Sequence, residues 1–127
     1  MWTYDRFEPG ALIGETGIRL DADILSNWAH LFPGTPQGKV SPDLLTAMMM
    51  RGYMAVISPR PPGNVHAGQR LCWTGHLPAQ DSLLQARYRC LDKEIRKERR
   101  RVTIGAQLVD EDGLVVLEGE LLMMWAA

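Results

Sequence analysis

The 127-residue sequence is 46% hydrophobic and 23% charged, which is ordinary for a folded globular protein and excludes disorder of the whole chain. The formal net charge of −1 excludes polyanion binding driven by overall charge. Two cysteines are too few for a disulfide scaffold, no apolar run reaches the roughly 20 residues that cross a bilayer, and the N-terminus has no signal-peptide core. We therefore expect one domain over residues 1–127, with no membrane segment, in the cytoplasm.

The first third of the chain is predicted to hold a short strand and a short helix. Residues 10–21 are a candidate strand. Asp21 is a good N-cap for a helix over residues 22–31, because its carboxylate can accept hydrogen bonds from N–H groups of the first turn. The apolar residues of that segment recur at helical spacing: Ile24, Leu25, Trp28 and Leu31.

A longer helix is predicted over residues 42–57. Ser41 is a good N-cap, and Pro42 suits the first helical position because its missing N–H would have no partner there. Apolar residues fall on every side of this segment, and Arg51 is its only charge after Asp43. Because a helix that is hydrophobic all round must be covered all round, we expect a sheet to wrap about it.

Four later segments alternate apolar and polar residues with a period of two, which is typical of half-buried strands. They cover residues 69–77, 84–90, 101–109 and 117–125. Residues 110–113, Asp-Glu-Asp-Gly, favour a hairpin turn, Asp81 and Ser82 mark another turn, and residues 92–94 are predicted to start a third. The predicted fold class is therefore α+β, with an antiparallel sheet wrapped around one long apolar central helix.

This arrangement resembles the hotdog fold, and three strings resemble the MaoC-like dehydratase and hydratase domains of that fold. They are the helix-forming segment at residues 19–31, Ser-Pro-Asp-Leu-Leu-Thr-Ala at residues 41–47, and the loop and start of a strand at residues 61–71. The resemblance implies a single hotdog domain that acts on acyl thioesters, carried by coenzyme A or by acyl carrier protein.

The catalytic string of MaoC-like hydratases is degenerate in this chain. That family holds an Asp and a His around one water, in the string Gly-Asp-x-Asn-Pro-x-His. The matching residues 31–39 are Leu-Phe-Pro-Gly-Thr-Pro-Gln-Gly-Lys, so Pro33 and Gly34 replace the Gly-Asp, and Gly38 or Lys39 replaces the His. Pro33 and Gly34 are nevertheless substrate-binding candidates, because their proline-glycine turn is preserved in the likeness to a second branch of the fold, described next.

A second branch of the fold supplies the catalytic candidates. Residues 30–36, His-Leu-Phe-Pro-Gly-Thr-Pro, resemble the His-Phe-Pro-Gly-x-Pro string of the β-hydroxyacyl carrier-protein dehydratases, with Leu31 inserted after the His. His30 is therefore the first candidate acid or base, and a surface histidine is the alternative. Those dehydratases also use an acidic residue in the central helix, where this chain has Met48 or a neighbour. Asp43 is the second candidate, and its alternative role is to stabilise the helix dipole.

A cluster of basic residues is the other candidate binding feature. Eight of the 14 Lys and Arg residues lie between Arg87 and Arg101. Such a cluster raises the local potential although the net charge is near zero. It could bind the phosphates of coenzyme A or the acidic surface of a carrier protein, with Arg96 and Arg99 as substrate-binding candidates. A solvated hairpin tip is the alternative, and nucleic acid is the least favoured partner because aromatic residues are not interleaved.

The remaining polar and sulfur-containing residues predict no metal site. No pair of histidines has metal-ligand spacing and no Cys-x-x-Cys occurs, so we expect neither metal nor cofactor. His66 is predicted in a loop and His76 on the polar face of a strand, and Cys72 and Cys90 are predicted on opposite strand faces. The methionines at residues 48–50 and 54 are predicted to be core residues, and they could also line an acyl channel.

Three functions remain open. The first is acyl-thioester binding with hydratase or dehydratase activity, through a catalytic pair that is degenerate or relocated. The second is a thioesterase, in which the helix N-terminus and Asp43 support attack by water on the carbonyl. The third is a non-catalytic subunit or ligand-binding module. For all three we expect a homodimer or a higher even homo-oligomer, because one curved sheet alone leaves an edge strand and a helix side uncovered.

Overall fold

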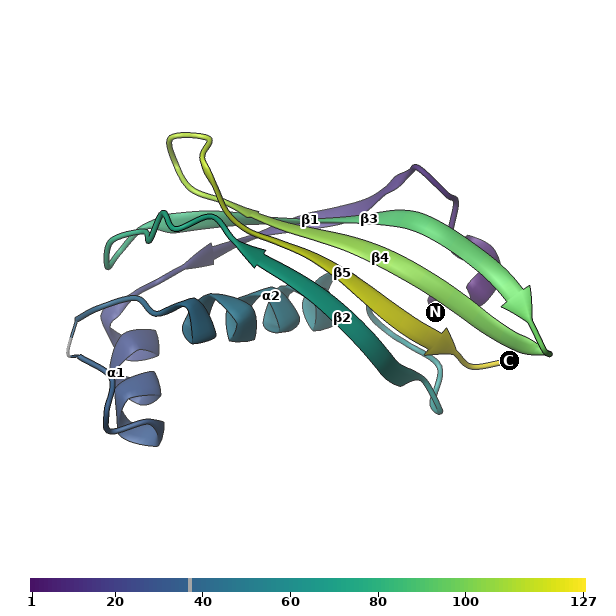
Figure 1. The fold of residues 1–127 in the computed structure, drawn as a ribbon, viewed down its shortest axis with the longest axis horizontal. Coiled ribbons are helices and arrows are strands. Elements are labelled where there is room, and N and C mark those ends of the chain that lie inside the picture. The colour runs from purple at the N-terminus through teal and green to yellow at the C-terminus, as the bar shows by residue number, and fades with distance from the viewer. Residues whose placement is uncertain (37) are drawn as a thin grey trace.

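The computed structural model describes residues 1–36 and 38–127, and it consists of a curved antiparallel sheet with helices on one side (Figure 1). The elements in chain order are η1 (Tyr4–Arg6), β1 (Leu12–Arg19), α1 (Ala22–Leu31), α2 (Pro42–Val56), β2 (Val65–Trp73), β3 (Leu83–Arg96), β4 (Arg99–Val109) and β5 (Val115–Trp125). The predicted α+β class is confirmed. Gln37, within the degenerate string at residues 31–39, lies outside the described residues.

The strands of the described residues form one five-stranded sheet in the order β1-β3-β4-β5-β2. All neighbouring strands are antiparallel. In this order the β3–β4–β5 meander forms the centre, and β1 and β2 are the two edges. The candidate strand at residues 10–21 is confirmed as β1. No helix among the described residues combines the length and the apolarity that a bilayer crossing demands.

Helix α2 packs on the inner face of the sheet and begins where its capping residues predict. The Leu44 N–H donates to Ser41 Oγ at 3.2 Å, and Pro42 is the first helical residue. Its buried residues face the sheet: Leu44, Leu45, Met48, Met49, Gly52 and Tyr53. The expectation that this helix is covered on every side is not confirmed within one chain, because Arg51 and Ala55 are exposed and Met54 is 55% exposed.

A close contact between α2 and β3 fixes the helix against the sheet. The Tyr88 hydroxyl, fully buried, donates a hydrogen bond to the Met49 carbonyl. Gly52 makes room for this ring, because a Cβ at that position would lie 3.3 Å from the Ala86 Cβ and closer still to the Tyr88 hydroxyl. Burial raises the pKa of Tyr88 far above its usual value, so the hydroxyl remains a donor.

Two predicted strand boundaries are wrong. Strand β2 spans Val65–Trp73 rather than residues 69–77, because Gly75 turns the chain at a φ of +89°. His66 therefore lies within a strand and His76 lies beyond it. The turn predicted to start at residues 92–94 is also wrong, since β3 continues to Arg96 and the chain reverses at Lys97 and Glu98, with φ of 51° and 65°. Neither residue is the Gly or Asn that normally marks such a turn, so the sequence carries no signal there.

Helix α1 spans the predicted residues and begins at the predicted cap, since the Ile24 N–H donates to Asp21 Oδ1 at 2.9 Å. It lies at one end of the sheet, beside the start of α2 (Figure 1). Both chain termini and the β3–β4 turn lie at the opposite end (Figure 1). There the Trp125 Nε1–H donates to the Trp2 carbonyl at 2.7 Å, which ties the two termini together.

Candidate functional site

The connection between α1 and α2 carries three of the predicted site residues. His30 lies in the last turn of α1, and Pro33 and Gly34 lie in the turn that follows; all three are exposed. Backbone hydrogen bonds order this turn: the Phe32 N–H donates to the Trp28 carbonyl, and the Thr35 N–H to the Phe32 carbonyl, each at 2.9 Å. The segment is thus an ordered turn at the C-terminal end of α1.

Exposed apolar side chains lie directly after His30 in this turn. Leu31 is 69% exposed and Phe32 is 51% exposed, and the Phe32 ring lies against Trp28 with 4.5 Å between ring centroids. Sequence periodicity placed Leu31 on the apolar face of the helix, but the structure leaves it in solvent. Exposed apolar side chains of this size suit an acyl group or a protein partner. The only sequence feature that points to this exposure is Leu31 itself, which is inserted after the His of the dehydratase-like string.

Asp43 is an exposed residue in the first turn of α2. The start of α2 lies at the same end of the sheet as α1 (Figure 1). The Trp73 Nε1–H donates to the Pro42 carbonyl at 3.1 Å, so the end of β2 holds the start of this helix in place. The first N–H groups of a helix have no partners within it, and they favour negative charge nearby. His30 and Asp43 therefore belong to two elements that share one end of the molecule.

Arg96 and Arg99 lie at the other end, on either side of the β3–β4 turn, and both are exposed. Strand β3 has 14 residues and runs between the two ends of the sheet. At a rise of about 3.3 Å per residue, that separation is roughly 45 Å. Within one chain, these arginines and His30 do not form a single site.

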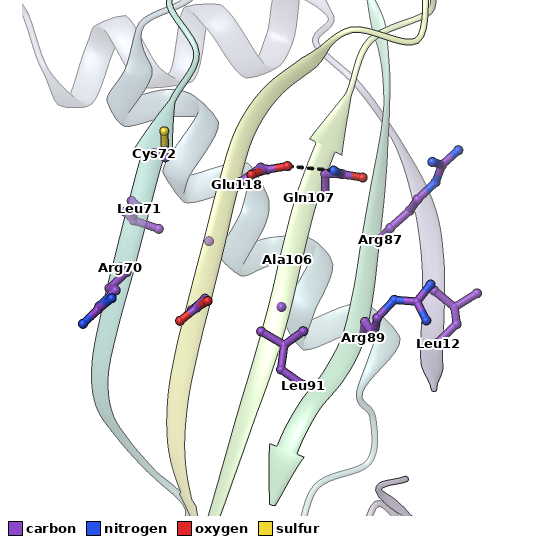
Figure 2. Close-up of a pocket in the computed structure, with 13 residues that line it drawn as sticks. Leu12, Arg70, Leu71, Cys72, Arg87, Arg89, Leu91, Ala106, Gln107 and Glu118 are labelled. Atoms are coloured by element: carbon purple, nitrogen blue, oxygen red, sulfur yellow. Dashed lines mark hydrogen bonds between the residues drawn. The ribbon is translucent and has the colours of Figure 1, made fainter. Parts of the chain in front are cut away.

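The basic cluster between Arg87 and Arg101 is divided by the geometry of the strands. Arg87 and Arg89 lie on the outer face of the sheet (Figure 2). Lys93 donates to the Tyr4 carbonyl at 3.2 Å and lies 4.5 Å from the centroid of that ring. Arg101 Nη1 contacts Glu94 Oε1 at 3.3 Å. The cluster is therefore several separate interactions rather than one patch.

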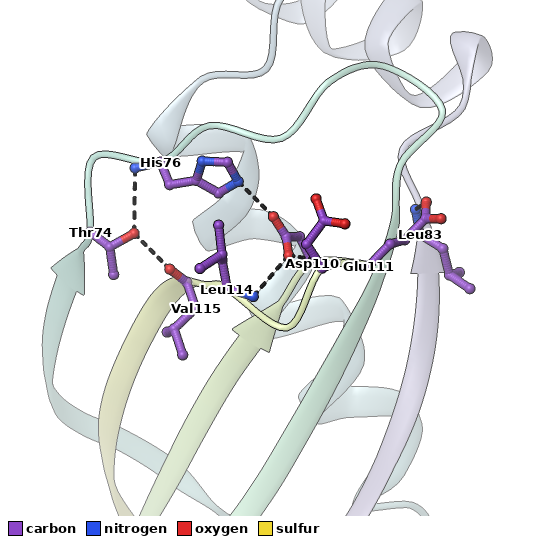
Figure 3. Close-up of polar contacts among 8 residues, drawn as sticks. Thr74, His76, Leu83, Asp110, Glu111, Leu114 and Val115 are labelled. Carbon is purple, nitrogen blue, oxygen red and sulfur yellow. Dashed lines mark hydrogen bonds and ion pairs between the residues drawn. The ribbon is translucent and has the colours of Figure 1, made fainter.

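A histidine–carboxylate contact that the sequence did not predict links the loop after β2 to the β4–β5 turn (Figure 3). His76 Nε2 lies 2.6 Å from Asp110 Oδ2, while Asp110 Oδ1 accepts the N–H groups of Leu114 and Asp112, each at 2.9 Å. The Leu114 N–H first, and then His76 and the Asp112 N–H, hold the pKa of Asp110 below its usual range. The sequence identified the turn but not the histidine, which is 34 residues away.

A groove of about 600 Å³ lies on the outer face of the sheet, away from the helices (Figure 2). Its lining is drawn from all the strands and includes the arginines Arg70, Arg87 and Arg89 and the carboxylates Glu118 and Glu120. Among the described residues, no three His, Cys, Asp or Glu side chains group closely enough to hold a metal ion.

The structure of the chain resembles solved hotdog proteins, while no protein-family model and no curated protein matches its sequence. A MaoC-like dehydratase from Rhodospirillum rubrum superposes with a TM-score of 0.83 at 17% identity, over 100% of this chain and 99% of that one. The R-hydratase PhaJ1 from Pseudomonas aeruginosa gives 0.77 at 20% identity, over 97% and 84%. A hypothetical thioesterase from Streptococcus pneumoniae gives 0.67 at 11% identity, over 95% and 93%. The chain therefore has the predicted hotdog fold, similar to that of MaoC-like dehydratases.

Proposed function

We propose that this protein binds an acyl thioester of coenzyme A or acyl carrier protein and adds or removes water across the α,β bond of the acyl group. The observation that carries the proposal is the likeness of the whole chain to a MaoC-like dehydratase and an R-hydratase. The exposed Leu31 and Phe32 beside His30 support it, because they offer apolar surface for an acyl group next to an imidazole.

In the proposed hydration, His30 acts as the base and Asp43 orients the water. His30 accepts a proton from the water molecule while the water oxygen attacks the β-carbon of the enoyl thioester. Negative charge then develops on the thioester oxygen, and the positive end of the α2 dipole favours it. The α-carbon takes up the proton that His30 accepted. Dehydration follows the same steps in reverse.

We further propose that the protein works as a homodimer formed through β2. This strand is a sheet edge that packs mainly against β5, and seven of its nine residues are exposed. A free edge of this kind can pair with a second copy. A twofold axis between antiparallel β2 strands reverses strand direction, so the β3–β4 turn of one copy falls at the end that carries α1 of the other. Arg96 and Arg99 of one chain would then serve the site of the other chain.

Hydration of crotonyl-CoA, followed by loss of the enoyl-thioester absorbance, tests the proposal. We expect turnover by the wild-type protein and a fall in kcat of roughly 10²- to 10⁴-fold in His30→Ala, the usual range for a lost acid or base. Asn27→Ala is the matched control, because Asn27 is an exposed residue of the same helix. Unchanged turnover in His30→Ala would remove that residue from the mechanism. Absence of wild-type turnover with a panel of enoyl thioesters would overturn the hydratase proposal.

A thioesterase is the second candidate, supported by the likeness to a hypothetical thioesterase and by Asp43 at the start of α2. In that reaction water attacks the thioester carbonyl, and a free thiol leaves. A thiol-reactive dye distinguishes the two reactions, since hydration releases no thiol. Thiol release that falls in Asp43→Asn but not in His30→Ala would favour the thioesterase. Acyl-CoA binding without either reaction would identify a non-catalytic binding module.

A further inference from the structure

The charged residues around the outer groove alternate in sign from strand to strand, with opposite signs on the two sides of β4. In the two rows of paired residues that cross the groove, the charges from one sheet edge to the other are negative on β1, positive on β3, absent on β4, negative on β5 and positive on β2; Arg19 and Arg101 lie farther along β1 and β4. The residues, in that order, are Glu15, then Arg87 and Arg89, then the uncharged Gly105 and Gln107, then Glu118 and Glu120, then Arg70. Figure 2 labels Arg70, Arg87, Arg89, Gln107 and Glu118 among them. The charges on β3 and β5 are therefore opposite on the two sides of β4, while Glu15 lies in the row of Arg87 and Arg70 in the row of Arg89.

The strand register aligns these charges in rows. Arg87 pairs with Gln107, and Gln107 with Glu118, so these three lie in one row across the sheet. Arg89, Gly105 and Glu120 form the next row. Because neighbouring strands are about 4.8 Å apart, each arginine and its glutamate lie at equal distances on either side of β4.

We infer that this outer face binds the same face of a second copy of the chain, about a twofold axis parallel to β4. Such a rotation carries β3 of one copy over β5 of the other, and β1 over β2. Arg87 then faces Glu118 and Arg89 faces Glu120, each pair occurring twice. A sheet face that meets its own copy in this way is an isologous interface, and here the copies match charge with opposite charge.

Apolar side chains occupy the centre of the same face. Leu91 is 41% exposed and leans over Gly105, with side-chain carbons 3.1 to 3.2 Å from the position where a Cβ would stand. Gly105 belongs to β4, which lies along the inferred axis, so the Leu91 side chains of two copies meet there. An apolar centre bordered by charged groups is the usual anatomy of a protein interface.

Contacts within the chain leave these charges available to a partner. Arg87 Nε lies 3.2 Å from Glu15 Oε2, and the two side chains are 49% and 46% exposed. The Gln107 Nε2–H donates to Glu118 Oε1 at 3.0 Å. A guanidinium has five donors and a carboxylate about four acceptor sites, so each retains capacity for a second partner. The exposed pair within the chain contributes little stability by itself.

This interface uses a different surface from the proposed β2 edge and does not rest on the proposed function. Four strand spacings make the face roughly 20 Å wide, which predicts an interface near the lower end of stable sizes. Association through it should therefore depend on protein concentration and weaken with salt. Together with the edge-to-edge dimer it produces a tetramer, and without that dimer it produces a dimer.

Charge reversal tested by sedimentation velocity over a range of concentrations provides the test. One variant carries Arg87→Glu and Arg89→Glu, and the other carries Glu118→Arg and Glu120→Arg. Each alone places like charges face to face, so each should lose one association step, with its dissociation constant raised at least tenfold. An equimolar mixture restores opposite charges on both sides of the axis and should recover the wild-type mass. Arg6→Glu with Arg51→Glu is the matched control, because it makes the same charge change at exposed residues of η1 and α2, outside the strands that form this face.

Each result of this experiment decides the question. Loss of association in the single variants with recovery in the mixture supports the inference. Equal masses for the wild type and both variants overturn it, and so does loss that mixing does not repair in variants whose circular dichroism matches that of the wild type. Circular dichroism of each variant separates damage to the fold from lost contact. The hydration assay on the same samples reports separately on the proposed function.

Discussion

Cys72 and Cys90 lie on opposite faces of the sheet, as predicted, and this makes their thiols chemically different. Cys72 is exposed on β2, whereas Cys90 is fully buried on the inner face of β3. Burial raises the pKa of the Cys90 thiol, and nearby Lys93 opposes this effect only in part. Because the thiolate is the reactive form, burial and a raised pKa both protect Cys90.

Thiol labelling of the native protein should therefore modify Cys72 quickly and Cys90 only after unfolding. A disulfide dye at pH 8, read by absorbance and by mass spectrometry of the peptides, measures both rates. In Cys72→Ser the fast phase should vanish while the protein remains folded. Fast modification of Cys90 in the native protein would show that this thiol is not buried.

At the scale of elements, the contact between α2 and β3 depends on Gly52 and Tyr88 together. Gly52→Ala should lower the free energy of unfolding by about 1–3 kcal/mol, because the added methyl group overpacks a buried site. This loss outweighs the gain of up to about 1 kcal/mol from the better helix propensity of alanine. Tyr88→Phe should cost about 1 kcal/mol, the usual contribution of one hydrogen bond.

The double variant distinguishes this contact from two unrelated effects. Removing the Tyr88 hydroxyl opens space for the alanine methyl group, so the combined loss should be smaller than the sum by about 1 kcal/mol. Urea denaturation of the four proteins measures this coupling. Additive losses would show that the Tyr88 hydroxyl does not limit the space available to a side chain at position 52.

The β4–β5 turn should stabilise the protein in a pH-dependent way through Asp110. Its folded pKa is lowered, chiefly by the Leu114 N–H and then by His76 and the Asp112 N–H, so its ionised form stabilises the fold above its unfolded pKa of about 4. That contribution is lost as the pH falls through the folded pKa. Asp110→Asn should therefore lower Tm at pH 7, and the difference from wild type should shrink below a pH of about 4.

Asp112→Asn is the control for this prediction, because it changes the same charge in the same turn. Asp112 is exposed and contributes its backbone N–H to the Asp110 carboxylate, so its side chain should matter little. Differential scanning calorimetry from pH 2.5 to 8 supplies the comparison. A Tm difference for Asp110→Asn that stays constant down to pH 2.5 would contradict a role for the ionised carboxylate.

Elements with local signals were predictable from the sequence, and elements set by distant contacts were not. Asp21 and Ser41 mark their helices because a cap is made within three residues. The β3–β4 turn escaped prediction because Lys97 and Glu98 adopt positive φ without the usual glycine, in a position that strand pairing imposes. The end of β2 was misplaced because alternation continues in the sequence to Leu77 after the sheet has ended.

For the candidate site, the sequence predicted only where its residues lie along the chain, and that they form a site stays a prediction. The resemblance located His30, Pro33, Gly34 and Asp43 on α1, α2 and the turn between them, and these elements do lie together. The exposure of Leu31 and Phe32 was not predictable, because periodicity marks which residues share a face but not whether a neighbour covers it. The separation of Arg96 from His30 follows from the length of β3, which the missed turn concealed.

At the scale of the whole molecule, the two ends of the sheet differ in chemistry. One end carries α1, the start of α2 and the His76–Asp110 contact, and the other carries both termini and the arginine-bearing β3–β4 turn (Figure 1). The proposed antiparallel dimer through β2 would bring unlike ends together. A thioester could then have its acyl group at one chain's α1 and its phosphates near the other chain's arginines.

Thermal stabilisation by ligands tests this arrangement. An acyl-CoA present at about 100 times its dissociation constant stabilises the folded state by about 2.7 kcal/mol. At roughly 4 °C per kcal/mol for a chain of this length, Tm should rise by about 10 °C. Replacing Arg96 and Arg99 with alanine should weaken acyl-CoA about tenfold, which is about 1.4 kcal/mol of lost contact with phosphate. The same acyl group on pantetheine lacks the nucleotide phosphates, so its smaller shift should be equal in the variant and the wild type. An equal loss for both ligands would mean that the arginines act on the fold, and the absence of any shift with acyl-CoA would overturn the binding proposal itself.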